Sequence, residues 1–169
     1  EQNYSVHNGL SGMFINQIIP DNEGNVWVLL YNNKGIDKIN PRTREVTKLF
    51  ADELNGEKSP NYLLCDEDGM LWVGFHGGVM RINPKDSSQQ SISFGNFSNN
   101  EILSMTSVKE HIWVSTTNGL WIIDRRTMDA RQQSLTDKRF TSLMFDPEDG
   151  NIYLGGADGF GISHPEIQA

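Results

Sequence analysis

The sequence predicts an all-β protein built from four repeated units of short antiparallel strands. Three observations support this prediction. An aromatic residue recurs in one local pattern at Trp27, Trp72, Trp113 and Tyr153, with spacings of 45, 41 and 40 residues. A polar turn precedes each aromatic residue, rich in Asp, Asn, Glu and Gly in three of the four copies. No stretch shows the 3.6-residue period of an amphipathic helix, so almost no helix is expected.

Each unit reads as a series of short strands separated by turns. An apolar pair three residues apart, such as Ile15 and Ile18, opens three of the units, whereas the second keeps only Leu63. The polar turn and the aromatic strand follow, and after six to eight residues comes a glycine with an apolar neighbour: Gly35, Gly78, Gly119 and Gly159. A third strand and then a fourth complete the unit. Four-stranded units about every 40 residues are typical of β-propeller blades.

The repeats place the four blades at about residues 12–50, 59–94, 99–135 and 138–169, within a single propeller fragment covering 1–169. The last copy stops after its third strand. Residues 1–11 are interpreted as a spare outer strand, over about 3–6, and a linker. Because open sheet edges tend to pair, we expect this strand to complete a blade, either within a ring or in a neighbouring chain. About four blades predict an arc or part of a larger propeller, and a homodimer is one way to complete it.

Composition and local motifs argue against several classes of function. The chain has 14 Lys and Arg against 22 Asp and Glu, a net charge of −8, which argues against binding to nucleic acid or to an anionic membrane. Cys65 is the only cysteine, and no run of 18 apolar residues occurs. The acidic turn at Asp66 lacks the twelfth-position carboxylate of an EF-hand-type loop, and the histidines lack zinc-site spacing. We therefore expect no metal, no cofactor and no catalytic residues.

The aromatic series has a structural interpretation. A large flat side chain at one repeated position fills the space between neighbouring blades, so Trp27, Trp72, Trp113 and Tyr153 are predicted inter-blade packing residues. The alternative is a platform on which sugars stack. Trp121 breaks the repeat, because the matching positions hold Asp37, Met80 and Gly161. It is therefore a better candidate for a specific contact.

Ligand contacts are predicted in the loops between the second and third strands of each unit, where the copies differ most. Divergent loops on a repeated scaffold are common sites of function. The mixture of aromatic and polar side chains suits an oligosaccharide, and the alternative is an irregular solvated rim. The candidate ligand-binding residues are Tyr31, Lys34, Phe75, His76, Asn118, Trp121 and Asp158.

These patterns resemble the propeller repeat of two-component regulators. The second copy matches it as Asp66-x-x-Gly69-x-Leu71-Trp72-Val73-Gly74, then Gly78-Val79 and Asn83-Pro84. The departures are Val108 where the third copy should have Asp, Tyr153 in place of Trp, and Ser163-His164-Pro165 in place of Asp-Pro.

The resemblance implies a fragment of the periplasmic sensor region of a hybrid two-component system histidine kinase. Such sensors are membrane-anchored, feed a phosphorelay, and typically detect oligosaccharides derived from polysaccharides. No kinase or receiver motif occurs in these residues, so the fragment itself is expected to be non-catalytic. The alternative is a structural propeller module that mediates dimerisation or assembly without binding a ligand. A propeller enzyme such as a lyase or glycosidase is a weaker third possibility.

Overall fold

The computed structural model describes residues 3–31, 35–49, 60–94, 101–133 and 139–164. Fifteen strands and one short 3-10 helix, η1 (Val6–Asn8), make up the described secondary structure. The strands of the first two sheets are β1 (Ile15–Pro20), β2 (Val26–Leu30), β3 (Ile36–Asn40), β4 (Glu45–Leu49), β5 (Pro60–Cys65), β6 (Leu71–Phe75), β7 (Gly78–Ile82) and β8 (Gln89–Ser93). Those of the third and fourth sheets are β9 (Ile102–Val108), β10 (His111–Thr116), β11 (Gly119–Asp124), β12 (Ala130–Gln133), β13 (Phe140–Phe145), β14 (Ile152–Gly156) and β15 (Gly159–Ser163).

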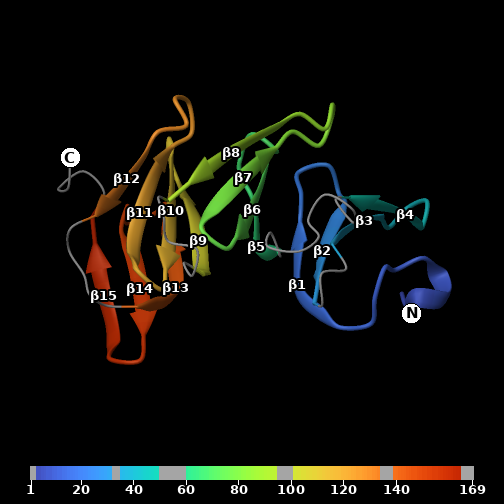
Figure 1. Ribbon diagram of the computed structural model, residues 1–169, viewed down its shortest axis with the longest axis horizontal. Coiled ribbons are helices and arrows are strands. Elements are labelled where there is room, and N and C mark those ends of the chain that lie inside the picture. The colour runs from blue at the N-terminus through green and yellow to red at the C-terminus, as the bar shows by residue number, and fades with distance from the viewer. Residues whose placement is uncertain (1–2, 32–34, 50–59, 95–100, 134–138, 165–169) are drawn as a thin grey trace. The chain divides into compact units, whose positions relative to one another are not determined.

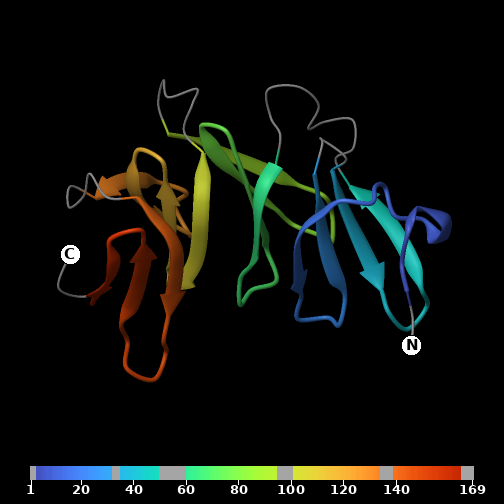
Figure 2. The same ribbon diagram turned by 90° about the horizontal axis from the view of Figure 1, so that it is seen from below.

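In every sheet, strands that follow one another in the sequence lie side by side (Figures 1 and 2). Three sheets have four strands and the last, β13–β14–β15, has three. The strands of the first, third and fourth sheets pair antiparallel throughout, as do β5 and β6 of the second sheet. The all-β, blade-like prediction is confirmed, and each sheet lies within one of the four predicted ranges. In the described part of the chain, no helix is long and apolar enough to cross a membrane.

The first two strands of each sheet pair with the same irregularity. The register shifts between Ile15 and Gln17, between Pro60 and Tyr62, and between Phe140 and Ser142, and a matching shift occurs where β9 meets Thr116. In each case one extra residue sits on the first strand of the sheet. Such β-bulges increase the local twist of a strand pair.

The N-terminal segment differs from its prediction. Residues 3–5 form no strand and Val6–Asn8 form η1, so the spare strand expected over about 3–6 is absent. Local hydrogen bonds explain the difference: the Ser5 hydroxyl accepts from the His7 N–H at 3.2 Å, and the Asn8 side chain accepts from the Ser5 N–H at 2.9 Å. This capping box satisfies backbone donors that a strand would have paired with a neighbour.

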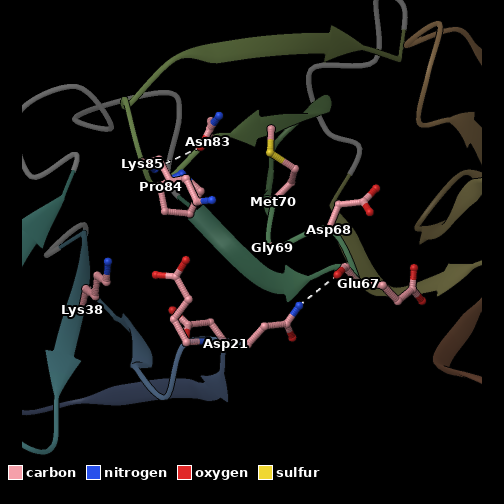
Figure 3. A pocket seen from close by; sticks show the side chains of 11 residues that line it. Asp21, Lys38, Glu67, Asp68, Gly69, Met70, Asn83, Pro84 and Lys85 are labelled. Atoms are coloured by element: carbon pink, nitrogen blue, oxygen red, sulfur yellow. Dashed lines mark hydrogen bonds between the residues drawn. The ribbon is translucent and has the colours of Figure 1, made fainter.

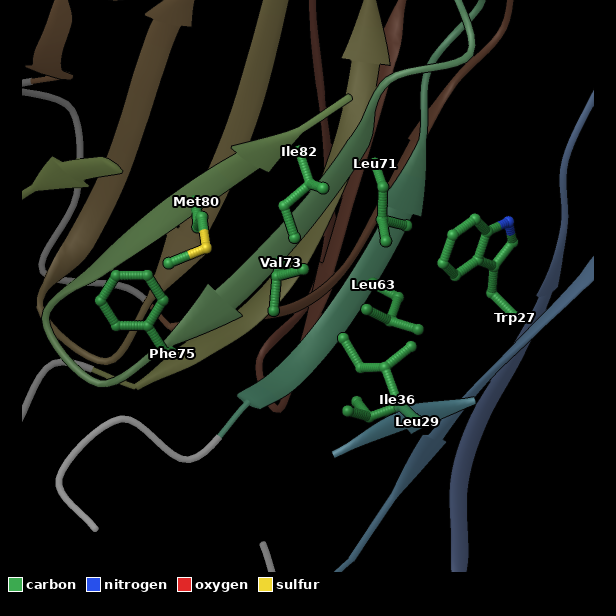
Figure 4. Close-up of a cluster of buried hydrophobic side chains, with 9 residues drawn as sticks. All are labelled: Trp27, Leu29, Ile36, Leu63, Leu71, Val73, Phe75, Met80 and Ile82. Atoms are coloured by element: carbon green, nitrogen blue, oxygen red, sulfur yellow. The ribbon is translucent and has the colours of Figure 1, made fainter. Parts of the chain in front are cut away.

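The chain divides into two compact units. The first comprises Glu1–His76 and Met80–Gln90, and the second comprises Gly77–Val79 and Ser91–Ala169. The core of the first unit contains side chains from the first and second sheets (Figure 4): Trp27, Leu29, Ile36, Leu63, Leu71, Val73, Phe75, Met80 and Ile82. The core of the second unit contains side chains from the third and fourth sheets: Val108, Trp113, Leu120, Ile122, Leu143, Ile152 and Leu154.

Candidate functional site

The acidic turn of the second sheet joins its aspartate to the repeated tryptophan. One carboxylate oxygen of Asp66 accepts hydrogen bonds from the N–H groups of Asp68 at 2.9 Å and Met70 at 3.0 Å. The other oxygen accepts from Trp72 Nε1 at 2.8 Å. Asp66 and Trp72 are both buried. This arrangement, which we call the Asp–aromatic clasp, uses the carboxylate to hold the turn, so the aspartate has a structural role.

The first sheet carries the same clasp. Asp21 accepts from the N–H groups of Glu23 at 2.8 Å and Asn25 at 2.9 Å, and from Trp27 Nε1 at 2.9 Å. Burial by itself would raise the pKa of Asp21, but hydrogen bonds from Asn25, Trp27 and Glu23 hold it below the ordinary value. The carboxylate is therefore ionised at neutral pH.

The clasp changes in the other two sheets. In the fourth, the turn is one residue longer, and the Tyr153 hydroxyl donates to Asp149, at 2.5 Å from Oδ2, instead of to Asp146. This hydrogen bond raises the pKa of Tyr153 and, together with the Asn151 N–H, lowers the pKa of Asp149. In the third, Val108 replaces the aspartate, and a two-residue turn at Lys109 and Glu110, with Lys109 at φ 53°, joins β9 to β10.

A cavity of about 330 Å³ opens beside the clasp turns of the first unit (Figure 3). Its walls are formed by turns 45 residues apart in sequence, and Asn22 Nδ2 donates to the Glu67 carbonyl at 2.9 Å. The Lys38 ammonium lies 5.3 Å from the centroid of the Trp27 ring. The lining residues are Asp21, Asn22, Glu23, Lys38, Glu67, Asp68, Gly69, Met70, Asn83, Pro84 and Lys85.

Carboxylate, amide and ammonium groups in one small cavity can bind hydroxyl-rich or cationic molecules. Sequence reasoning missed this cavity because it assigned the recurring turns to the scaffold alone. The available signal was the pair of acidic side chains, Glu23 and Asp68, in matching turns of the first and second sheets. Within the described ranges, no group of three or more His, Cys, Asp or Glu side chains could hold a metal ion. Burial, and then the charges of Asp21 and Asp66, raise the pKa of the nearby Cys65 thiol to about 11.

The predicted loop residues of the first unit have different environments. Tyr31 follows β2 and its side chain is 52% exposed, whereas Lys34 lies outside the described residues. His76 is partly buried in a two-residue turn with Gly77. Phe75 is only 7% exposed and packs in the core, so its ring does not face an open loop as predicted. Tyr31 and the cavity lie at opposite ends of β2, because the clasp turn precedes this strand and the loop follows it.

In the second unit, Asn118 and Asp158 are exposed, each in a two-residue turn between strands. Trp121 lies within β11 and stacks on Phe94, with ring centroids 4.8 Å apart and planes 19° apart. Its indole N–H is buried without a hydrogen-bond partner in the described part of the chain. Trp121 departs from the repeat, and the sequence alone did not predict that it packs against Phe94.

The predicted inter-blade aromatics also differ among themselves. Trp27, Trp72 and Trp113 are at most 2% exposed, whereas Tyr153 is partly exposed. Trp27 and Trp113 belong to the two cores in which neighbouring sheets meet. Ile162, which pairs with Tyr153, is 58% exposed, so Tyr153 lies on a largely exposed face of the last sheet.

Comparison with known proteins agrees with this architecture. The family profile described as "Two component regulator propeller" matches residues 9–32. The chain is 90% identical to the extracellular domain of BT4673 from B. thetaiotaomicron, described as a hybrid two component system, with a TM-score of 0.92. That match covers 97% of this chain and 22% of the solved chain. No curated protein matches the chain.

More distant structures share the fold. The extracellular domain of BT3049, a hybrid two component system protein of B. thetaiotaomicron by its description, is 20% identical, with a TM-score of 0.79 over 99% of this chain and 24% of its own length. Virginiamycin B lyase from Staphylococcus aureus is 13% identical, with a TM-score of 0.65 over 91% of this chain and 57% of its own. These two likenesses concern the fold alone.

The chain thus carries the two component regulator propeller repeat and is similar to part of the extracellular domain of a hybrid two-component system. The predicted family resemblance and the predicted extracytoplasmic, periplasmic location are confirmed. The chain spans less than a quarter of the length of the first two solved domains described here.

Proposed function

We propose that this chain is part of the ligand-detecting region of a membrane-anchored hybrid sensor histidine kinase. The observation that carries the proposal is the 90% identity, over 97% of this chain, to the extracellular domain of a protein described as a hybrid two component system. The signal would pass across the membrane to a phosphorelay in the rest of such a protein. The chain itself is proposed to be non-catalytic.

We further propose that the ligand is an oligosaccharide derived from a polysaccharide. Exposed Tyr31 offers an aromatic surface and a hydroxyl, which together suit a sugar ring. The cavity of the first unit offers carboxylate, amide and ammonium groups that can hydrogen-bond to sugar hydroxyls. These two surfaces lie at opposite ends of β2, so variants can test them separately.

Isothermal titration calorimetry with a panel of oligosaccharides tests the proposal. Tyr31→Ala removes the aromatic surface, and the double variant Glu23→Gln/Lys85→Ala removes charges from the cavity. Thr47→Ala, at an exposed position of β4, is the matched control. Binding that is at least tenfold weaker in one test variant and unchanged in the control would locate the site. If no oligosaccharide of the panel gives a binding heat with the wild-type chain, ligand detection by this chain is contradicted.

The second candidate function is a structural propeller module that supports assembly without binding ligand. Three of the four loops predicted to carry ligand contacts contain a two-residue turn, which leaves few side chains to form a rim. The burial of Phe75 also removes one predicted contact. Binding of no oligosaccharide, together with defined self-association, would favour this function.

A further inference from the structure

A buried carboxyl group interrupts the repeat in the first sheet. Asp37, the second residue of β3, is fully buried, whereas the matching positions of the other sheets hold Met80, Trp121 and Gly161. Its two oxygens both accept from Ser11, from the N–H at 2.7 Å and from the hydroxyl at 2.6 Å. A carboxyl group in an apolar core is unfavourable unless hydrogen bonds satisfy it. Asp37 therefore requires Ser11 in one place, and we call this pair the latch.

The latch fixes the segment that leads into β1. Leu10, next to Ser11, is only 5% exposed and packs in one cluster with side chains of β2 and β3. Gly9 ends η1 in the left-handed conformation, at φ 108°, and so turns the chain toward the sheet. The segment before the first strand is thus held by a hydrophobic contact at Leu10 and by a directional polar contact at Ser11.

Three residues after the latch, the same segment holds the residue that begins the loop after β2. The Tyr31 N–H donates to the Phe14 carbonyl at 2.9 Å, one position beyond Ile15 and Leu30, the last pair of the β1–β2 ladder. Three residues span at most about 10 Å of extended chain. A displacement of Ser11 is therefore passed on to Phe14 and to its hydrogen bond with Tyr31.

The other half of the latch lies just after the same loop. The loop returns to the sheet at Gly35, whose carbonyl accepts from the Leu30 N–H at 3.2 Å, and Asp37 follows two residues later. Ser11 lies on the segment that binds the start of the loop, and Asp37 lies on the strand that receives its end. The latch therefore joins the two backbone segments between which Tyr31 is held.

The third sheet has a similar arrangement without a carboxylate. The Thr117 N–H donates to the Glu101 carbonyl at 3.1 Å, as the corresponding groups do in the first sheet. Phe94, from the segment before this sheet, stacks on Trp121, which takes the position of the latch carboxylate. Stacked rings can slide, whereas two hydrogen bonds from one residue to one carboxylate require a narrow range of geometry. Buried polar pairs of this kind can serve conformational specificity in place of stability.

We propose that the latch is a positioning device for the ligand surface at Tyr31. The inference rests on the proposed function in one respect, the assignment of Tyr31 to the oligosaccharide site. Ser11 and Asp37 act through the backbone and not by touching the ligand: they hold the segment whose Phe14 carbonyl binds the Tyr31 N–H. The exposed ring is thus carried on an ordered backbone, so less conformational freedom is lost when a sugar binds.

Amide hydrogen exchange measured by NMR tests the latch without any ligand. Asp37→Asn keeps the size of the side chain but weakens the bonds from Ser11, and Asp37→Met supplies the residue found in the second sheet. In both variants the Tyr31 N–H is expected to exchange about tenfold faster than in the wild type, because the segment opens locally. The reference is the Leu63 N–H of the same unit, which donates to Gln17 at 2.9 Å and reports wider opening.

Ser11→Thr is the conservative control, because it keeps both the N–H and the hydroxyl that the latch uses. It is expected to leave the exchange of the Tyr31 N–H within about twofold of the wild type. Circular dichroism verifies that each variant is folded. Asp37→Met leaves no buried carboxyl group without partners, so it remains a test even if Asp37→Asn unfolds. Wild-type exchange of the Tyr31 N–H in a folded Asp37→Met chain overturns the latch.

Calorimetry then tests the positioning role. For an oligosaccharide that Tyr31→Ala binds more weakly than the wild type, Asp37→Asn and Asp37→Met are expected to lower affinity about tenfold, and Ser11→Thr is expected to preserve it. Unchanged affinity in the two Asp37 variants overturns positioning by the latch. A wild-type chain that binds no oligosaccharide contradicts the proposed function instead, and the exchange rate of the Tyr31 N–H still decides whether the latch holds this residue.

Discussion

The second and fourth sheets show what the repeat determines and what it leaves to the surroundings. Both place an aromatic residue at the same register position and hydrogen-bond it to a turn aspartate. Trp72 and Asp66 are at most 3% exposed, whereas Tyr153 is partly exposed and Asp149 is exposed. The local sequence builds the turn in both sheets. Burial differs with the surroundings, since Phe160 and Ile162 beside Tyr153 are 74% and 58% exposed, whereas Trp72 is fully buried.

Truncation of the aromatic residue is expected to give the largest difference in stability between the second and fourth sheets. Trp72→Ala removes a fully buried indole, the partner of Asp66, and the ring over which the Arg81 guanidinium lies, 5.6 Å from the centroid. We expect a loss of about 3–5 kcal/mol in the free energy of unfolding. Tyr153→Ala is expected to cost much less, because its side chain is partly solvated. Urea denaturation followed by tryptophan fluorescence and circular dichroism measures both, and equal losses would refute the comparison.

Glycine substitution gives the next largest contrast. A Cβ added at Gly78 of β7 would lie 2.1 Å from the Ile92 carbonyl oxygen, which belongs to the backbone and cannot move alone. Gly78→Ala is expected to cost about 3 kcal/mol. A Cβ at Gly161 of β15 meets nothing within 4 Å, so Gly161→Ala is expected to change stability by less than about 0.5 kcal/mol. Thermal unfolding of the two variants checks this, and a larger effect at Gly161 would contradict it.

Neutralising the clasp aspartate is expected to have a smaller effect that still depends on burial. Asp66→Asn keeps the size of the side chain but weakens three hydrogen bonds to a buried acceptor, at an expected cost of about 1–2 kcal/mol. The matched variant Asp149→Asn acts on an exposed pair and is expected to cost less. Urea unfolding at neutral pH compares them. A greater loss of unfolding free energy for Asp149→Asn would show that burial does not determine how much the clasp contributes to stability.

The smallest expected effect is the pH response of the exposed clasp. Because Asp149 raises the pKa of Tyr153, the neutral phenol is favoured in the folded state. Its contribution to stability is therefore full below the ordinary tyrosine value of about 10 and is lost as pH rises through the raised pKa. NMR titration of the Tyr153 ring should give a midpoint above that ordinary value. The midpoint should fall in Asp149→Asn, and an unchanged one would exclude Asp149 as the cause.

Local sequence chemistry was sufficient to predict the sheets. The turn glycines, the acidic turn residues and the repeated aromatic each act within a few residues, so the four strand sets could be placed without a structure. The turn before the third aromatic, where Val108 replaces Asp, still forms as a tight turn at Lys109 and Glu110. Strand pairing on both sides holds such a turn even when its usual residues are missing.

Contacts between sheets could not be predicted in the same way. The burial of Phe75 and the stacking of Trp121 on Phe94 depend on side chains contributed by other strands. The cavity forms where turns 45 residues apart meet, and no local pattern encodes its volume. The N-terminal helix η1 was missed because Ser5 and Asn8 can cap a turn as readily as they can flank a strand.

The bulge that all four sheets share at the start of the first strand has a consequence for how such chains can lengthen. Each repeat contains the extra residue that bends and twists its own first strand pair. This local twist is therefore encoded inside the repeat and not in a distant segment. A tandem duplication of the corresponding gene segment would copy the bulge together with the strands, so each added repeat would bring its own twisted first strand pair.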